Sequence, residues 1–296
     1  MQTVPVNPLR HRSANRRTAP WVFGIGLATV LGLAMSPVSA EDSPSSVSTE
    51  VAMKTNTDGA GLLLPRFAID TNSATGTTTL FAVRNEGGQS VDIDIEYYRS
   101  NSPQAPQRTE TITLAGKAVH TVNIRSVPNL PTDPDGFKRG FVRIVGPSTA
   151  ELHGDYFLID PANDFASGNR LLNTDPSSGH SDLCNLFTMR FLDGGGFDGG
   201  TVYDIFIDVD ANPDGSDPVM DILAYDQAGN LLVAREYFAD EVSFRVPADD
   251  LLGPSVSENF GALEFQFRNG AVGHVSGVMS ALGRYSVGFE ASCGAP

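Results

Sequence analysis

The chain has 296 residues, a formal net charge of −15 and only two cysteines. An acidic surface repels the phosphate backbone of nucleic acids, so this composition argues against a nucleic-acid-binding protein and favours cationic or basic partners. High net charge also serves solubility. The length is sufficient for two domains of ordinary size or for one large sandwich.

The first forty residues have the three parts of a cleaved secretory signal. Four arginines within residues 10–17 precede an apolar run from Trp21 to Met35, and the small residues Val38-Ser39-Ala40 follow. The apolar run is shorter than the about 20 residues that a transmembrane helix requires. We therefore expect cleavage before Glu41 and a secreted or periplasmic protein that is not inserted in a membrane.

Cleavage at this site would leave 256 residues with all 35 acidic side chains and 16 of the 20 basic ones, a formal charge of −19. It would also remove Trp21, the only tryptophan. Exposed tryptophans are the side chains on which carbohydrate-binding modules most often stack sugars, so the sequence does not favour that kind of module.

Residues 41–60 are rich in Ser, Thr, Asp and Gly, and we expect them to form a flexible leader. From Gly61 onward the chain reads as short β-strands. Apolar and polar residues alternate in 91–98, 242–246 and 263–268. This alternation places one set of side chains in a core and the other in water. Gly, Pro, Asn and Asp interrupt the pattern about every ten residues, which favours a sandwich or a barrel.

Several short motifs recur in the same order, with an offset that drifts by only a few residues. The pairs are Arg66-Phe67 with Arg190-Phe191, Gly76-Thr77 with Gly200-Thr201, Tyr98 with Tyr225, Gly140 with Gly261, and His153 with His274. They predict an all-β protein of two tandem immunoglobulin-like or jelly-roll-like antiparallel β-sandwich domains related by internal duplication. The first domain would span 61–174 and the second 183–296, joined by a linker at 175–182.

The two cysteines, Cys184 and Cys293, both fall in the second predicted domain. An even pair in an exported protein usually forms a disulfide. Such a bridge would join the first and last strands of that domain. The alternatives are a two-residue metal site or a catalytic thiol.

Residues 210–221 match the spacing D-x-N-x-D-G with a further acid at the twelfth position. This stretch resembles the calcium loops of EF-hand and dockerin-like modules, and the resemblance implies a structural calcium ion. The expected ligands are Asp210, Asn212 and Asp214 through their side chains, Ser216 through its carbonyl oxygen, and Asp221 through the closing carboxylate. We expect no other cofactor.

Three features separate this loop from an EF-hand, the first being Asp217 at the eighth position, where those families prefer an aliphatic residue. Its flanks, Thr201–Val209 and Ile222–Tyr225, have the pattern of strands rather than helices, and Asp221 replaces the usual bidentate glutamate. Asn, Asp, Pro and Gly are also turn residues, so the alternative is an acidic hairpin turn.

The sequence contains no G-x-S-x-G, S-x-x-K or H-E-x-x-H motif. We therefore expect an exported non-catalytic protein with a binding or structural role in the periplasm, envelope or extracellular space, acting on a protein or polymer partner. The alternative is a secreted hydrolase that attacks an extracellular polymer through loop carboxylates.

Overall fold

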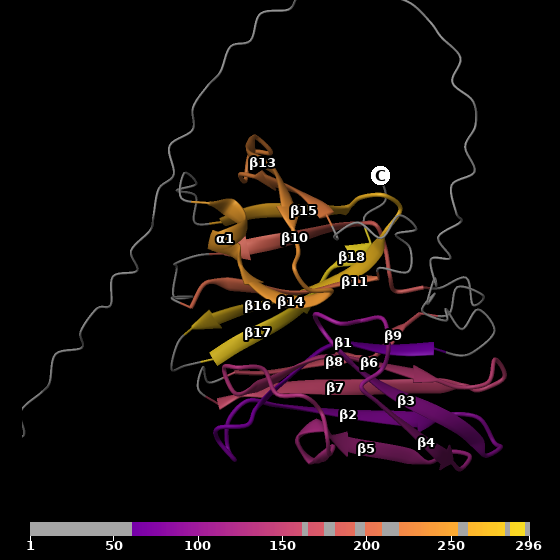
Figure 1. The fold of residues 1–296 in the computed structure, drawn as a ribbon. Helices are drawn as coiled ribbons and strands as arrows, with labels where there is room; N and C mark the ends of the chain where they lie inside the picture. Colours follow the sequence, from indigo (N-terminus) through magenta and orange to yellow (C-terminus); the bar gives the residue numbers. More distant parts are fainter. Residues whose placement is uncertain are drawn as a thin grey trace, which may run out of the picture. The chain divides into compact units, whose positions relative to one another are not determined.

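The structure is a computed structural model, and it describes the chain from Gly61 to Cys293 with six internal gaps. The described ranges are 61–161, 165–174, 181–192, 199–208, 219–253, 260–281 and 285–293. The predicted signal peptide, the leader, most of the linker and most of the acidic loop lie outside them. Within these ranges nearly all of the regular secondary structure is β-strand, in four antiparallel sheets (Figure 1), which confirms the all-β sandwich class.

The first half of the described chain forms a five-stranded sheet in the order β4-β3-β6-β1-β9 and a four-stranded sheet in the order β5-β2-β7-β8. A single 3₁₀ turn, η1, follows β5. The elements are β1 (Gly61–Asp70), β2 (Thr78–Asn85), β3 (Val91–Arg99), β4 (Arg108–Leu114), β5 (Val119–Asn123), η1 (Ile124–Ser126), β6 (Phe137–Val145), β7 (Leu152–Asp160), β8 (Phe165–Arg170) and β9 (Leu172–Asn173).

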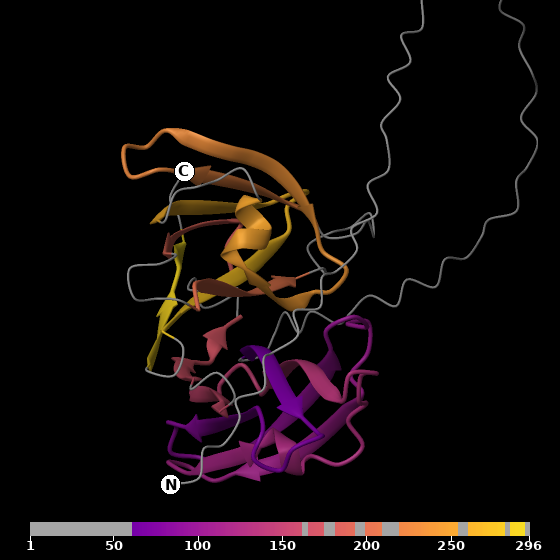
Figure 2. The same ribbon diagram turned by 90° about the vertical axis from the view of Figure 1, so that its left-hand side faces the viewer.

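The second half forms a five-stranded sheet in the order β13-β12-β15-β10-β18 and a four-stranded sheet in the order β14-β11-β16-β17. A short helix, α1, follows β14 (Figure 2). The elements are β10 (Leu186–Leu192), β11 (Thr201–Asp208), β12 (Val219–Tyr225), β13 (Leu231–Phe238), β14 (Ser243–Pro247), α1 (Ala248–Leu252), β15 (Phe260–Phe267), β16 (Val272–Ala281), β17 (Tyr285–Glu290) and β18 (Ser292–Cys293).

The two halves share one strand order, since replacing β1 to β9 by β10 to β18 in sequence converts the first pair of sheets into the second. Strand registers agree as well. Phe67 lies opposite Gly140 as Phe191 lies opposite Gly261. His153 and His274 also lie at equivalent positions of β7 and β16, as their cross-strand partners in β2 and β11 show.

One of the recurring pairs is displaced by two residues. The hydroxyl of Thr201 exchanges hydrogen bonds with the backbone of Leu192, and in the first half Thr79, not Thr77, makes the corresponding bonds to Ala68. The match of Gly76-Thr77 with Gly200-Thr201 is therefore wrong as a structural equivalence.

The repeated glycine marks a place where β-strand backbones and an aromatic ring approach closely. A Cβ at Gly140 would collide with the carbonyl oxygen of Tyr98 and press on the ring of Phe67. A Cβ at Gly261 would meet Tyr225 and Phe191 in the same way. Glycine is retained at both positions because any side chain would force the neighbouring strand away.

Each half buries its own core between its two sheets, as the alternation of apolar residues predicts. The first core includes Phe81, Ile95 and Val142, and the second includes Tyr203, Ile222 and Phe265, all at most 1% exposed. Side chains from η1 and α1 complete the two cores.

The alternation in β3 does not place Tyr98 in water, although it follows the polar positions of that strand. Tyr98 is 5% exposed because it belongs to a third apolar cluster, shared by both halves. Its ring stacks on Phe141 at 4.8 Å between ring centroids, and Phe141 meets Phe206 of the second half edge-on at 5.1 Å. Glu50–Pro296 accordingly forms one compact unit.

A β-bulge in β1 prepares this contact. The register against β6 shifts between Leu64 and Phe67, at Pro65-Arg66, whereas β10 pairs with β15 without a shift. Proline has no N–H to give to a ladder, so a bulge accommodates it. The carbonyl oxygen of Pro65 accepts a hydrogen bond from the Ser243 hydroxyl at 2.7 Å.

Candidate functional site

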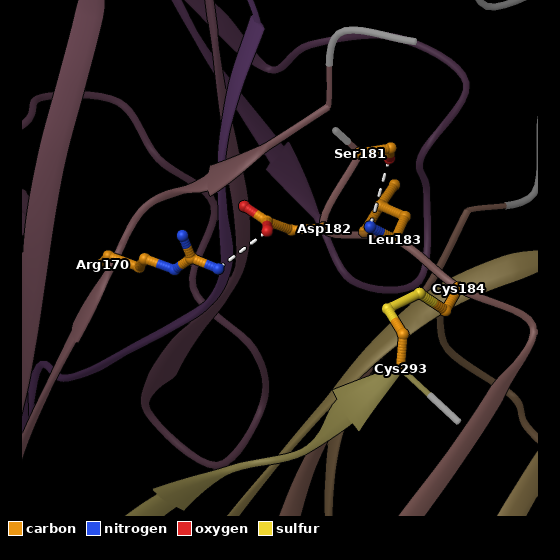
Figure 3. The surroundings of a disulfide bond; sticks show 6 residues. All are labelled: Arg170, Ser181, Asp182, Leu183, Cys184 and Cys293. Carbon is orange, nitrogen blue, oxygen red and sulfur yellow. Dashed lines mark hydrogen bonds and ion pairs between the residues drawn. A yellow bond between two sulfur atoms is a disulfide. The ribbon is translucent and has the colours of Figure 1, made fainter. Parts of the chain in front are cut away.

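Cys184 and Cys293 form a disulfide with a Cα–Cα distance of 5.8 Å, which confirms the predicted bridge (Figure 3). Cys184 precedes β10 and pairs through its backbone with Gly273, and Cys293 lies in β18 beside Phe187 of β10. The bond closes a segment of 109 residues and joins the two ends of the second sandwich. It also removes both thiols from metal binding and from catalysis.

Of the five expected calcium ligands, Asp210, Asn212, Asp214 and Ser216 lie outside the described residues. The expected strands on either side are present as β11 and β12. Calcium binding through this loop stays a prediction.

Asp221 lies in β12 and is held by an arginine rather than left open. Its carboxylate accepts two hydrogen bonds from Arg268, at 2.7 Å from Nε and 2.5 Å from an Nη atom, and the second Nη donates to Glu236 at 2.6 Å. These carboxylates raise the pKa of Arg268. A calcium ion in the loop would have to compete with this guanidinium for Asp221. Among the described residues, no group of three or more His, Cys, Asp or Glu side chains could hold a metal.

A groove of about 600 Å³ lies where the start of β1, the start of β7 and the ends of β8 and β9 come together in the first sandwich. Four carboxylates surround it, from Glu86, Glu151, Asp155 and Asp182. In β7 the buried Leu152 and Tyr156 alternate with exposed residues, so His153 and Asp155 face solvent. The groove therefore has a polar, largely acidic rim.

Leucine side chains form part of the lining between these polar groups. Leu62, Leu152 and Leu171 are each at most 7% exposed and belong to the first core. A lining that combines leucine side chains with carboxylates suits a ligand that has both an aliphatic chain and a positive charge.

Two of the four carboxylates already have cationic neighbours. Asp182 accepts a hydrogen bond from Arg170 at 2.8 Å, as Figure 3 shows, and its second oxygen accepts the backbone N–H of Asn173 at 2.7 Å. Glu86 lies 3.4 Å from a guanidinium nitrogen of Arg84. Glu151 and Asp155 make no ion pair with any described residue, so they are the carboxylates most available to a ligand.

A second charged cluster is buried where the two sandwiches meet. Asp204 of β11 accepts hydrogen bonds from Arg245 of β14 at 2.8 and 2.5 Å, and Nε of Arg66 lies 3.2 Å from the same carboxylate. The three side chains are 10–23% exposed. Burial lowers the pKa of Arg66 to about 10 despite the charge of Asp204. Burial also opposes ionisation of Asp204, but the two guanidinium charges outweigh it and lower its pKa.

The two equivalent histidines have different surroundings. His153 is exposed and lines the groove. His274 is 4% exposed, and neither ring nitrogen has a hydrogen-bond partner among the described residues. Burial lowers the pKa of His274 to about 4.

Sequence reasoning singled out these histidines and Arg66 only as repeated positions. It missed the groove altogether, because the groove combines side chains from several strands whose packing the alternation does not specify. The one available signal was the excess of acidic over basic residues.

Within the ranges that the structure describes, no helix has both the length and the apolar character needed to cross a bilayer. Comparison of the chain with protein-family models and with curated proteins finds no match.

Proposed function

We propose that the protein is exported and acts without catalysis, as a binding module that offers the acidic groove of its first sandwich to a cationic partner. The groove is the observation that carries this proposal, since carboxylates and leucine side chains line it together. A lysine or arginine side chain fits such a site because its methylene stem packs on leucine while its charged end meets carboxylates. A basic segment of a protein or polymer is therefore the preferred class of partner.

The shared apolar cluster and the buried ions support a rigid pair of sandwiches. Common strand order and register support an origin by internal duplication. The copies would then have divided their roles. The first keeps an open groove beside His153, whereas the equivalent His274 is covered.

Export is supported by the signal-like residues 1–40 and by the disulfide, which forms in oxidising compartments. Mass spectrometry of the exported protein should give a chain that begins at Glu41. A chain that still carries Met1 would contradict this part of the proposal.

The binding test uses the mature chain and a short oligolysine peptide, measured by calorimetry at low and at moderate salt. Glu151→Gln combined with Asp155→Asn should weaken binding at least tenfold, because it removes the two groove carboxylates that make no ion pair with any described residue. Asp240→Asn combined with Asp249→Asn removes the same charge from exposed sites in the second sandwich and is the matched control.

Equal weakening by both double variants would show that net charge alone attracts the peptide. Binding that neither variant changes would place the contact elsewhere. Either result would refute the groove as the binding site.

The alternative is a secreted hydrolase that uses the same groove, favoured by the combination of carboxylates with the exposed His153. It predicts turnover of an extracellular polysaccharide or peptide polymer, abolished by Glu151→Gln or Asp155→Asn. Loss of turnover without loss of polymer binding would favour the hydrolase over the binding module.

A further inference from the structure

We propose that His274 is an acid-sensitive latch between the two sandwiches, so that protonation of its ring releases the second sandwich from the first. The proposal is independent of the groove's ligand. It rests on the position of His274 in the interface and on the absence of hydrogen-bond partners for its ring among the described residues.

The outward face of β16 shows that His274 belongs to this interface. Alternate residues of a strand share one face, so His274, Ser276 and Val278 point the same way. Val278 packs with Ala68 and Leu158 of the first sandwich. Ser276 also lies close enough to the hydroxyl of Tyr156, in the first sandwich, to oppose the rise that burial causes in the pKa of that tyrosine.

Charged groups from three neighbouring segments face His274. They are Asp182 at the end of the predicted linker, Arg170 of β8 and Asp204 of β11. The ring of Phe187 in β10 covers another side, edge-on at 6.0 Å between centroids. The two aspartates favour a charged imidazole and Arg170 opposes it, but burial outweighs all three.

Glu290 of β17 completes this group of titratable residues. Burial raises the pKa of Glu290, while the charge of Arg170 opposes that shift and Asp182 adds to it. Acidification therefore also neutralises Glu290, in the same direction of pH change. The experiment must therefore distinguish the effect of protonating His274 from the effect of protonating Glu290.

A protonated imidazole needs hydrogen-bond acceptors or water, and no described residue accepts a hydrogen bond from the ring of His274 in the closed interface. Separation of the sandwiches would bring the ring into water, where it binds a proton readily. Protons consequently bind the open form better than the closed form and shift the population toward opening.

The direction and range of the effect follow from the pKa of about 4 in the closed form and the ordinary value of 6.5 in water. The closed form keeps its full advantage above pH 6.5 and loses it progressively as the pH falls toward 4. At pH 4 the ratio of open to closed molecules should be roughly 160-fold higher than well above pH 6.5, and it should approach about 300-fold only at still lower pH, since each pKa unit is worth about tenfold.

The test compares small-angle X-ray scattering and far-ultraviolet circular dichroism of the mature protein from neutral pH down to pH 4. The wild type should expand on acidification while its strand signal is unchanged. His274→Asn should stay compact over the same range, because asparagine does not take up the proton. His153→Asn, at the equivalent but exposed position, should expand like the wild type.

Expansion of wild type and His274→Asn at the same pH would overturn the latch, as would expansion that coincides with loss of the strand signal.

Glu290→Gln should expand on acidification like the wild type. If Glu290→Gln stays compact while His274→Asn expands, the effect belongs to the carboxylate and not to the histidine. Should His274→Asn fail to fold, nuclear magnetic resonance of the wild type decides. A ring that titrates near 6.5 while the protein remains compact refutes the proposal.

Discussion

Replacing Asp204 by asparagine tests whether the buried ions hold the two sandwiches together. In the wild type one carboxylate serves two guanidinium groups, Arg245 at 2.5 and 2.8 Å and Arg66 at 3.2 Å. Asparagine has a similar shape but no charge. Asp204→Asn therefore leaves two positive groups facing each other at a site where their side chains are only 10% and 23% exposed.

The expected cost is large because Asp204 no longer offsets the desolvation of the two arginines, although Arg245 keeps the attraction of Asp160 and Arg66 that of Glu241. Removal of one member of a buried ion pair typically destabilises a protein by about 3–5 kcal/mol. In a unit of this size, about 1 kcal/mol lowers the melting temperature by roughly 2–4 °C. Asp204→Asn should therefore lower the melting temperature by roughly 6–20 °C.

The matched control is Asp221→Asn, which breaks a second bidentate arginine pair on the outer face of the second sandwich. Arg268 and Glu236 are 38% and 48% exposed there, so water and salt screen the interaction and the loss should be small. Both variants are compared by calorimetry in the presence of a chelator, which excludes any effect of calcium on the control.

Acid provides an independent check with a definite sign. The lowered pKa of Asp204 means that its contribution is present above the ordinary value of 3.8 and is lost as the pH falls through the lower native value. The difference in melting temperature between wild type and Asp204→Asn should therefore disappear on acidification. Equal melting temperatures of Asp204→Asn and Asp221→Asn at neutral pH would refute the reasoning. A difference in melting temperature between wild type and Asp204→Asn that does not change with pH would refute it as well.

Three further predictions concern the second sandwich and its repeat. Cys184→Ser should destabilise it by up to about 4.8 kcal/mol in a denaturant titration, the chain-entropy value for closing 109 residues, and a loss below 1 kcal/mol would contradict a constraining bridge. Gly140→Ala and Gly261→Ala should each cost about 1–3 kcal/mol by the same method, because each added Cβ meets backbone, and a neutral result at either site would deny the close approach. Millimolar calcium should raise the melting temperature, and Asp214→Ala should abolish that rise; identical melting with calcium and with chelator would leave the loop an acidic turn.

Alternation in the sequence was sufficient to predict the strands and the sandwich class. The predicted strand at 91–98 is β3, Val91–Arg99, and the predicted strand at 263–268 lies within β15 except for its last residue. Strands half buried against one core have a period of two, and that period is independent of which strand lies beside them. The disulfide was predictable for a different reason, since an exported chain with two cysteines has a single pairing.

The same rule fails where a second surface covers the outward face of a sheet. Tyr98 follows three acidic residues in the polar set of β3, yet it is buried because Phe141 and Phe206 cover it. Leu63 is likewise an outward residue of β1 that is 1% exposed. Periodicity within one strand carries no information about contacts between domains, so the interface and the Arg66–Asp204 pair were not predictable from it.

The way each sandwich fastens its last strand explains why only one copy contains cysteine. Cys293 in β18 pairs with Phe187 as Asn173 in β9 pairs with Leu62, so the two residues are equivalent. Cys293 is bonded covalently to Cys184, whereas Asn173 exchanges backbone hydrogen bonds with Asp182, donating to its carboxylate at 2.7 Å and accepting its N–H at 2.8 Å. The last strand of the first sandwich is thus held by Asp182, the residue that leads into the second sandwich. Where the second sandwich has a disulfide within one domain, the first has a contact that depends on both domains. The last strand of the first sandwich is therefore best held when the two sandwiches stay together. His274 lies next to this contact, since it faces both Asp182 and Arg170.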